Sequence, residues 1–217
     1  MTGMNLERSR TYTLLDSLDL QKSEIIDYFW PMYTETVYYL RYSLSQYCLL
    51  LLINFFDLGV ITGRRNMKAM IFFFQKHILF QGTLLHDIVV VDLPGKRLRF
   101  AISYLIGSLR YNLRVRLTLY TRELLPIMTL VQLFNIAFWL EREIWDMYGI
   151  LIMDHPDMRR LLTDYNFHGF PGRKDFPLTG FFEIHYSDIK KCIIQKRVSL
   201  AQAYRYYEFR NPWINLR

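Results

Sequence analysis

Alternation of apolar and polar residues predicts β-strands in the middle of the chain. Residues 97–106 (RLRFAISYLI) and 113–120 (LRVRLTLY) each place apolar side chains at every second position, which is typical of a strand with one buried face. Residues 85–93 (LHDIVVVDL) are rich in β-branched residues and end at the turn dipeptide Pro94-Gly95. Because the connections are short, we expect the three strands to be antiparallel neighbours.

Helical periodicity flanks this predicted three-strand meander. Residues 65–80 and 138–149 repeat apolar side chains every three or four positions, which predicts helices packed on a sheet, and Gly149 suits a helix end. The short apolar run 47–56 favours a buried strand, and we expect a further helix over residues 20–29. The pattern predicts an α+β fold with a mixed or antiparallel sheet, helices on one face, and an extended irregular C-terminal arm.

The predicted organisation has three parts: an N-terminal extension (1–40), an α+β domain (41–150) and an extended interface arm (151–217). The arm opens with HPDMRRLLTDYNFHGFPGRKDFPLTG at residues 155–180. Proline and glycine punctuate this stretch, which excludes one long helix or strand. Its aromatic residues argue against disorder, so we expect an ordered, irregular segment that needs partners for its backbone.

Charge and hydropathy limit the classes of function that the chain can have. The chain has 27 Lys and Arg against 20 acids, and residues 155–217 hold eleven of the cations but six of the acids. A basic segment can meet nucleic acid, anionic lipid or an acidic partner, or can be a solvated face. The longest uncharged run, residues 124–140, has 17 residues where a membrane helix needs about 20. We therefore expect no membrane span.

The N-terminus lacks the apolar stretch of a secretory signal and is acidic for a mitochondrial presequence. For a mitochondrial protein, this favours synthesis inside the organelle.

Candidate catalytic groups have structural explanations. Glu141, Glu143 and Asp146 could serve acid–base chemistry, but Arg142 beside them favours structural ion pairs, with Asp146 four residues away as its partner. His155 could act as a base, but a histidine between aspartates in a turn more often binds backbone groups. The two cysteines cannot hold an iron–sulfur cluster, the histidines lack metal-ligand spacing, and no glycine-rich phosphate loop occurs. We therefore expect no catalytic, cofactor or metal site.

The stretch WLEREIWDMYGILIMDHPDMRRLLTDYNFHGFPGRKDFPLTGF resembles the signature of the 30-kDa-type subunit family of respiratory complex I. The patterns ERE-x-x-D-M-x-G, HPD-x-RR-x-LTDY and RKDFPLTG match in order and spacing, and the resemblance extends roughly over residues 78–213. Asn166, Phe170 and Gly172 depart from the usual glycine, histidine and larger apolar residue of that family.

The resemblance implies a cofactor-free structural and assembly subunit in the matrix arm of the NADH:ubiquinone oxidoreductase, not an enzyme on its own. The complex would lie in the mitochondrial inner membrane and couple electron transfer to proton pumping, with FMN and iron–sulfur clusters on partner subunits. The expected partners are the quinone-cavity subunit and the terminal iron–sulfur subunit, with no nucleic acid. A basic RNA-binding module of a mitochondrial ribosome is the alternative.

The residues of the signature are the expected interface positions: Glu141, Arg142, Glu143, Asp146, His155, Pro156, Asp157, Arg159, Arg160, Asp164, Tyr165, Arg173, Lys174, Asp175 and Phe176. The arginines would bind carboxylates or carbonyls across an interface, and the aromatic residues would fill pockets on a partner.

Overall fold

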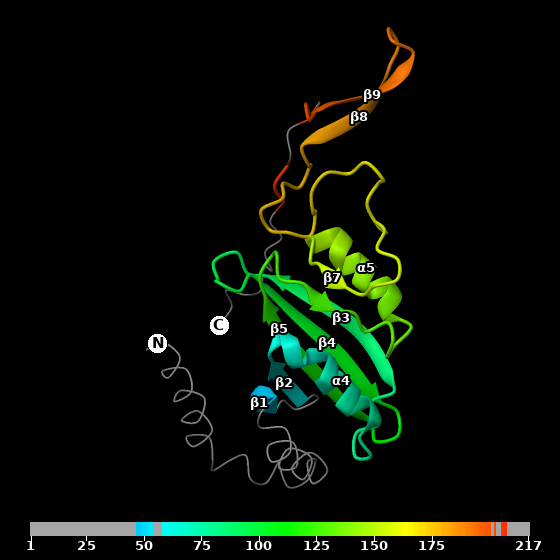
Figure 1. Ribbon diagram of the computed structural model, residues 1–217. Helices are drawn as coiled ribbons and strands as arrows, with labels where there is room; N and C mark the ends of the chain where they lie inside the picture. Colours follow the sequence, from blue (N-terminus) through cyan, green and yellow to red (C-terminus); the bar gives the residue numbers. More distant parts are fainter. Residues whose placement is uncertain (1–46, 54–57, 201, 203–204, 208–217) are drawn as a thin grey trace, which may run out of the picture. The chain divides into compact units, whose positions relative to one another are not determined.

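The computed structural model describes residues 47–53, 58–200, 202 and 205–207 (Figure 1). The chain divides into two units, residues 1–167 and 168–217. The predicted arm was expected to start at residue 151, whereas residues 151–167 belong to the first unit. The N-terminal extension and the helix expected over residues 20–29 lie outside the described residues.

A five-stranded mixed sheet forms the first unit. Its order is β1 (Cys48–Ile53), β2 (Leu58–Thr62), β5 (Leu113–Thr121), β4 (Phe100–Ser108) and β3 (Leu84–Asp92). The antiparallel meander of β3, β4 and β5 confirms the prediction from alternation. Strand β2, which the sequence did not predict, pairs parallel to β5 and makes the sheet mixed.

Two helices cover the face of the sheet that carries the alternating apolar residues. Helix α4 (Met67–Lys76) follows the 3-10 turn η1 (Arg64–Asn66), and helix α5 (Ala137–Tyr148) ends at Gly149 with φ 72°. Strand β4 contacts both helices through one face, on which Phe100 and Ile106 both lie. The ring of Phe100 is edge-on to that of Tyr148 on α5, with 6.3 Å between the ring centroids, and Ile106 lines a small cavity together with Phe74 of α4. The predicted helices on one face are therefore present.

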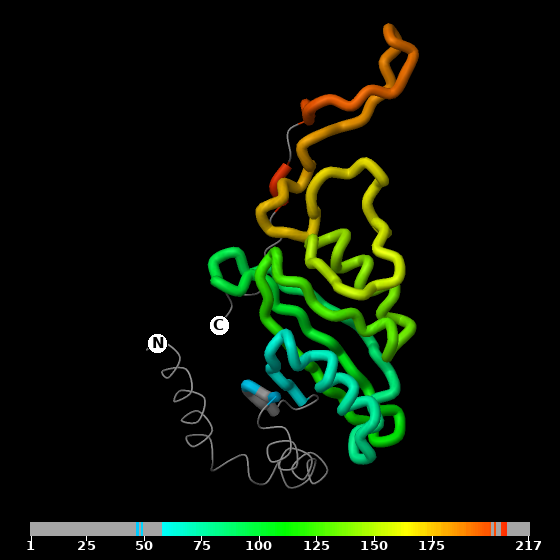
Figure 2. Tube along the Cα trace, in the orientation of Figure 1, coloured from blue at the N-terminus to red at the C-terminus, as the bar shows by residue number. Residues whose placement is uncertain are grey.

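A short parallel pair, β6 (Ile127–Met128) and β7 (Ile152–Met153), joins the segment before α5 to the segment after it. The uncharged run 124–140 thus passes through a strand, a turn and the beginning of α5. Among the described residues, no helix is long and apolar enough to cross a membrane. Beyond β7 the chain forms the loop that follows α5 (Figure 2).

The second unit contains an antiparallel hairpin, β8 (Phe182–Ser187) and β9 (Cys192–Arg197), within the arm that was predicted to be irregular. Before the hairpin, the ring of Phe176 packs edge-on against Phe181 at 5.4 Å. Gly169 has φ +107°, and a Cβ there would lie 2.9 Å from the ring of Phe176. Glycine therefore allows this close approach.

We predict that Gly82→Ala destabilises the first unit. A Cβ at Gly82 would lie 2.7 Å from Cγ2 of Ile106 and 3.2 Å from the carbonyl oxygen of Phe74, both in the core. Overpacking of this kind costs about 1–3 kcal/mol. Urea unfolding of the purified chain measures the loss. Gly95→Ala is the control, because nothing lies within 4 Å of its Cβ; equal loss in both variants would contradict the prediction.

Candidate protein-interaction site

The carboxylate of Asp146 on α5 is the centre of a buried polar cluster. Its Oδ1 accepts hydrogen bonds from Nη1 of Arg160 at 2.9 Å and from the hydroxyl of Thr163 at 2.5 Å. Its Oδ2 accepts from the backbone amides of Leu161, Leu162 and Thr163 at 3.1, 2.8 and 2.9 Å. One fully buried carboxylate therefore receives five hydrogen bonds from the loop after α5.

These hydrogen bonds set the pKa of Asp146. Burial raises the pKa of the carboxyl, but the Thr163 hydroxyl and the three loop amides outweigh burial and lower the pKa to about 2. The carboxylate is therefore ionised at neutral pH, and it pairs with the Arg160 guanidinium. The charge of Asp146 therefore has a structural role, because both carboxylate oxygens accept hydrogen bonds from the loop and are not exposed to solvent.

Arg142, one turn earlier on α5, binds the same loop through its carbonyl groups. Its Nε donates to the carbonyl oxygen of Arg159 at 3.1 Å and its Nη2 to that of Arg160 at 3.4 Å. The guanidinium also lies over the ring of Trp139 at 5.1 Å. We name Arg142 and Asp146, together with residues 159–163, the α5 clamp. In this clamp the guanidinium of Arg142 donates hydrogen bonds to two loop carbonyls, and the carboxylate of Asp146 accepts them from the next three loop amides.

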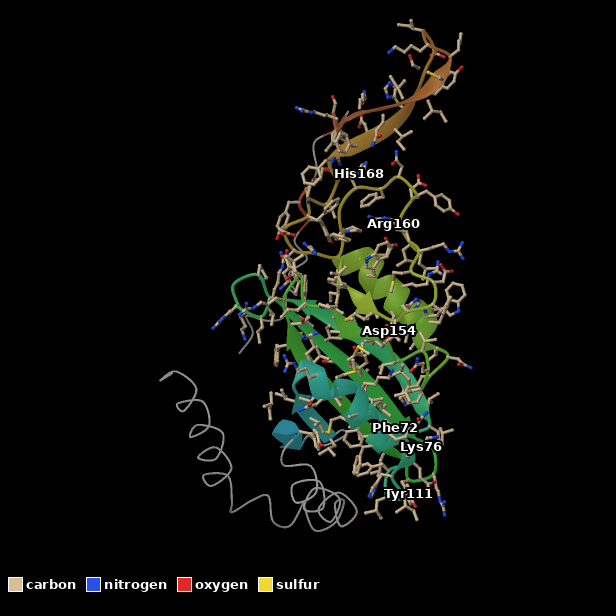
Figure 3. All side chains as sticks on the ribbon, viewed as in Figure 1. Phe72, Lys76, Tyr111, Asp154, Arg160 and His168 are labelled. Atoms are coloured by element: carbon tan, nitrogen blue, oxygen red, sulfur yellow. The ribbon has the colours of Figure 1, made fainter. Side chains whose placement is uncertain are left out.

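The predicted pairing of Arg142 with Asp146 is therefore wrong. The spacing of four residues does place both side chains on one face of α5, but each reaches the loop and satisfies its backbone groups instead. Arg160, expected to bind a carboxylate or carbonyl across an interface, forms an ion pair with Asp146 of its own chain, and its guanidinium lies 5.6 Å from the ring centroid of Trp145. Figure 3 labels Arg160 in the loop that follows α5.

Glu141, also buried on α5, binds the segment before the helix. Its carboxylate accepts from the hydroxyl of Thr129 and from the amide of Leu130, both at 2.6 Å. Burial raises the pKa of Glu141, and these two hydrogen bonds act in the opposite direction. The structural interpretation of this acid is thus supported by its contacts.

His155 has the backbone contacts expected of a turn histidine. Its Nδ1 accepts from the amide of Asp157 at 3.1 Å, and its Nε2 lies 3.2 Å from the carbonyl oxygen of Phe138. A ring protonated on Nε2 satisfies both contacts. Its Nε2 is also 4.0 Å from Glu141, but both side chains are at most 2% exposed, so this pair is out of reach of a substrate.

The remaining predicted positions of the first unit lie at its surface. Glu143 is exposed on α5, and the side chain of Arg159, 73% exposed, pairs with Asp157 at 2.9 Å. Pro156, Asp164 and Tyr165 are exposed as well. The α5 clamp therefore buries the charged part of the motif and leaves its outer side available for contact.

In the second unit, Arg173 and Phe176 are half-buried. The guanidinium of Arg173 lies 4.6 Å from the ring centroid of Phe170, where the sequence departs from the usual histidine of the family it resembles. Lys174 and Asp175 are exposed. The two halves of the predicted site thus lie in different units.

Sequence reasoning missed several residues that hold this region together. Thr129 and Thr163 bind the buried carboxylates of Glu141 and Asp146, and their hydroxyls gave no distinct sequence signal. A third buried acid, Asp92 at the end of β3, accepts two hydrogen bonds from the guanidinium of Arg99 at 2.7 and 2.9 Å. Arg99 lies just before β4, at a polar position of the alternating run 97–106.

Comparison with known proteins identifies the chain's relatives. The family model described as "Respiratory-chain NADH dehydrogenase, 30 Kd subunit" matches residues 60–182. A relative from Acanthamoeba castellanii, named NADH-ubiquinone oxidoreductase subunit 9, is 44% identical over 154 residues, which are 71% of this chain and 78% of the relative. A relative from Solanum tuberosum, named NADH dehydrogenase [ubiquinone] iron-sulfur protein 3, is 42% identical over 152 residues, 70% of this chain and 80% of the relative.

A solved structure described as the membrane-bound sulfane sulfur reductase, an archaeal respiratory membrane complex, has a similar fold. A chain of that complex matches with a TM-score of 0.57 and 16% identity, over 67% of this chain and 85% of the other. The family match and the sequence relatives define a subunit of a respiratory electron-transport complex. The chain belongs to the family of 30-kDa subunits of the respiratory-chain NADH dehydrogenase, complex I.

The described residues contain no group of three or more His, Cys, Asp or Glu side chains placed to hold a metal ion. Cys192 is a free, exposed thiol. The expectation that FMN and iron–sulfur clusters lie on other subunits stays a prediction.

We predict that Asp146→Asn unfolds the α5 clamp. The amide side chain keeps the shape but carries no charge for Arg160, and its NH₂ group faces donors. Removing one member of a buried ion pair costs about 3–5 kcal/mol. Urea unfolding of the purified chain measures this loss. Glu143→Gln is the matched control, because Glu143 lies on the same helix and is exposed; a similar loss in the control would count against the clamp.

The stability of the chain should also depend on pH through Asp146. Its pKa in the folded chain, about 2, is below the ordinary value of 3.8, so the carboxylate stabilises the fold above pH 3.8. This contribution is lost as the pH falls from 3.8 towards 2. Urea midpoints measured across this window should decrease more steeply in the wild type than in Asp146→Asn. Parallel curves for the two proteins would refute the assignment.

Proposed function

We propose that the chain is a non-catalytic bracing subunit of complex I. It holds the quinone-cavity subunit and the terminal iron–sulfur subunit in fixed relative positions, so that electron transfer and quinone entry keep their geometry. Membership of the 30-kDa subunit family supports a place in the complex. The bracing role is inferred from the shape of the α5 clamp.

One observation carries this proposal: buried groups fix the loop after α5 from inside, while the loop exposes large apolar side chains on its outside. The clamp immobilises residues 159–163 through buried groups, whereas the side chains of Leu162 and Tyr165 are 60% and 99% exposed. An irregular loop presented in one conformation loses little entropy on binding, which favours tight association. Exposed aromatic residues on such a loop are suited to fill pockets on a partner.

The proposal includes location and cofactors. The complex lies in the mitochondrial inner membrane with this chain on the matrix side, and the gene is in the organelle. FMN and iron–sulfur clusters are bound by partner subunits. Pro156, Arg159, Asp164 and Tyr165 contact those partners directly, while Arg142, Asp146 and Arg160 act by shaping the loop.

The alternative of an RNA-binding module rests on net charge alone. Arg160, which was counted among the basic groups of the motif, is neutralised by Asp146, and Arg159 lies beside Asp157. An independent enzyme using His155 is disfavoured because both ring nitrogens already have backbone contacts. Neither alternative gains a supporting contact.

We predict that the double variant Leu162→Ser, Tyr165→Ala impairs assembly of complex I. Both side chains are exposed, so the isolated chain should fold normally. Loss of an aromatic anchor costs about 2 kcal/mol or more, which is about 30-fold in affinity. Native gels of mitochondrial membranes measure the fraction of the chain in the assembled complex.

The control is Leu109→Ser, a change of an exposed apolar residue in the β4–β5 turn, where the side chain is 77% exposed. Normal abundance and NADH:ubiquinone activity with the double variant would refute the bracing role of this loop.

A further inference from the structure

The hairpin of the second unit has two faces of different character. On one face, the cross-strand pairs are Phe182 with Arg197, Ile184 with Gln195, and Tyr186 with Ile193. We name these six residues the docking face. Its apolar members are exposed: Phe182 by 52%, Ile184 by 62%, Tyr186 by 56% and Ile193 by 71%.

The opposite face carries polar side chains, and among the described residues nothing hydrogen-bonds the buried Nδ1 of His185 there. Glu183 pairs there with Lys196 at 3.0 Å, and this hydrogen-bonded ion pair lowers the pKa of the carboxyl. His185 lies opposite Ile194, and Ser187 opposite Cys192. The side chains of Glu183, His185, Ser187 and Ile194 are half-buried, in contrast to the apolar residues of the docking face. The uncovered apolar surface is thus confined to one side of the hairpin.

The second unit contains little of its own to stabilise the hairpin. Among the described residues from His168 onward, none is buried, and the sheet there has two strands. An isolated two-stranded hairpin is marginally stable in water, since stability normally needs a third strand or a packed face. Exposed contiguous apolar patches of this kind mark interaction sites.

We propose that the docking face binds an apolar groove with an acidic rim on a neighbouring protein subunit. The inference rests on the proposed function and identifies the chemistry of one contact. The composition fits an interface: two aromatic residues and two isoleucines form the centre, and cations lie at the border. Arg197 lies at one end of the face, and Lys190 and Lys191 lie in the turn at the other end.

Two other occupants fit these observations less well. A second copy of the chain would bring Arg197, Lys190 and Lys191 close to the same cations, and like charges repel. A lipid surface would leave the amide of Gln195, between the apolar residues, without a directional hydrogen-bonding partner, whereas a protein groove supplies donors and acceptors. The observations therefore favour a protein surface.

The test compares isoleucines on the two faces of the same hairpin. Ile184→Thr and Ile193→Thr keep a β-branched side chain for the strand but remove apolar contact from the docking face. Ile194→Thr is the matched control on the opposite face, adjacent in the same strand. We expect the fraction of chain in assembled complex I on native gels to decrease about tenfold for the docking-face variants and to stay within about twofold for the control.

The acidic rim is tested in native complex I by zero-length carbodiimide cross-linking, which joins a lysine amine to a carboxylate in direct contact. We expect Lys190 or Lys191 to be linked to an Asp or Glu of another subunit. Complete absence of such links, or equal loss of assembly in the Ile194→Thr control, would overturn the proposal.

Further outcomes separate the occupants. The first is a vesicle-binding assay with equal parts phosphatidylcholine and phosphatidylglycerol. If the full chain binds these vesicles, and Ile184→Thr abolishes this binding but leaves assembly normal, the proposal is overturned in favour of lipid. The second is size-exclusion chromatography. If the chain elutes as a dimer, and Ile184→Thr converts it to a monomer but leaves assembly normal, the proposal is overturned in favour of a second copy.

The result also distinguishes this inference from the proposed function. If the Leu162 and Tyr165 double variant impairs assembly and the docking-face variants do not, the bracing role stands and the hairpin proposal falls. If the docking-face variants impair assembly and the double variant does not, the hairpin proposal stands and the role of the α5 loop falls.

Discussion

The binding of three consecutive loop amides by the buried carboxylate of Asp146 is the constraint on which the interaction site depends. Backbone groups of an irregular segment need partners once they are removed from water. Helices and strands supply these partners internally, but residues 159–163 form neither. Asp146 and Arg142 supply them from α5, so the loop has one conformation without regular secondary structure.

This constraint explains how a strongly charged motif can belong to a protein-interaction site. The charges of Arg142, Asp146 and Arg160 are satisfied within the chain, and none of them has to be desolvated again when a partner binds. Burying unpaired charges at an interface is costly, whereas burying Leu162 and Tyr165 is favourable. The motif therefore separates two tasks: its buried charged residues fix the loop, and in our proposal its exposed residues make the contact.

Periodicity along the chain predicted the elements that depend on short-range patterns. The β3–β5 meander, α4, α5 and the left-handed Gly149 all follow from short-range patterns. The contacts of Asp146 were not predictable in this way, because its partners lie 14–17 residues away in a segment without periodicity. The parallel pairing of β2 also depends on long-range contact. For the hairpin, by contrast, the alternation of Phe182, Ile184 and Tyr186 with polar residues is a local signal for strand β8.

The distribution of the core separates the two units energetically. All buried hydrophobic residues described for this chain lie between Leu58 and Ile150, and none lies in the second unit. The first unit therefore has its own hydrophobic driving force, and the α5 clamp adds a rigid loop to it. Ordering the backbone of the second unit costs about 1–2 kcal/mol per residue, and its described residues bury no hydrophobic side chain to offset that cost. In our proposal, partner subunits supply part of this stabilisation, so that folding of the second unit is coupled to assembly of the complex.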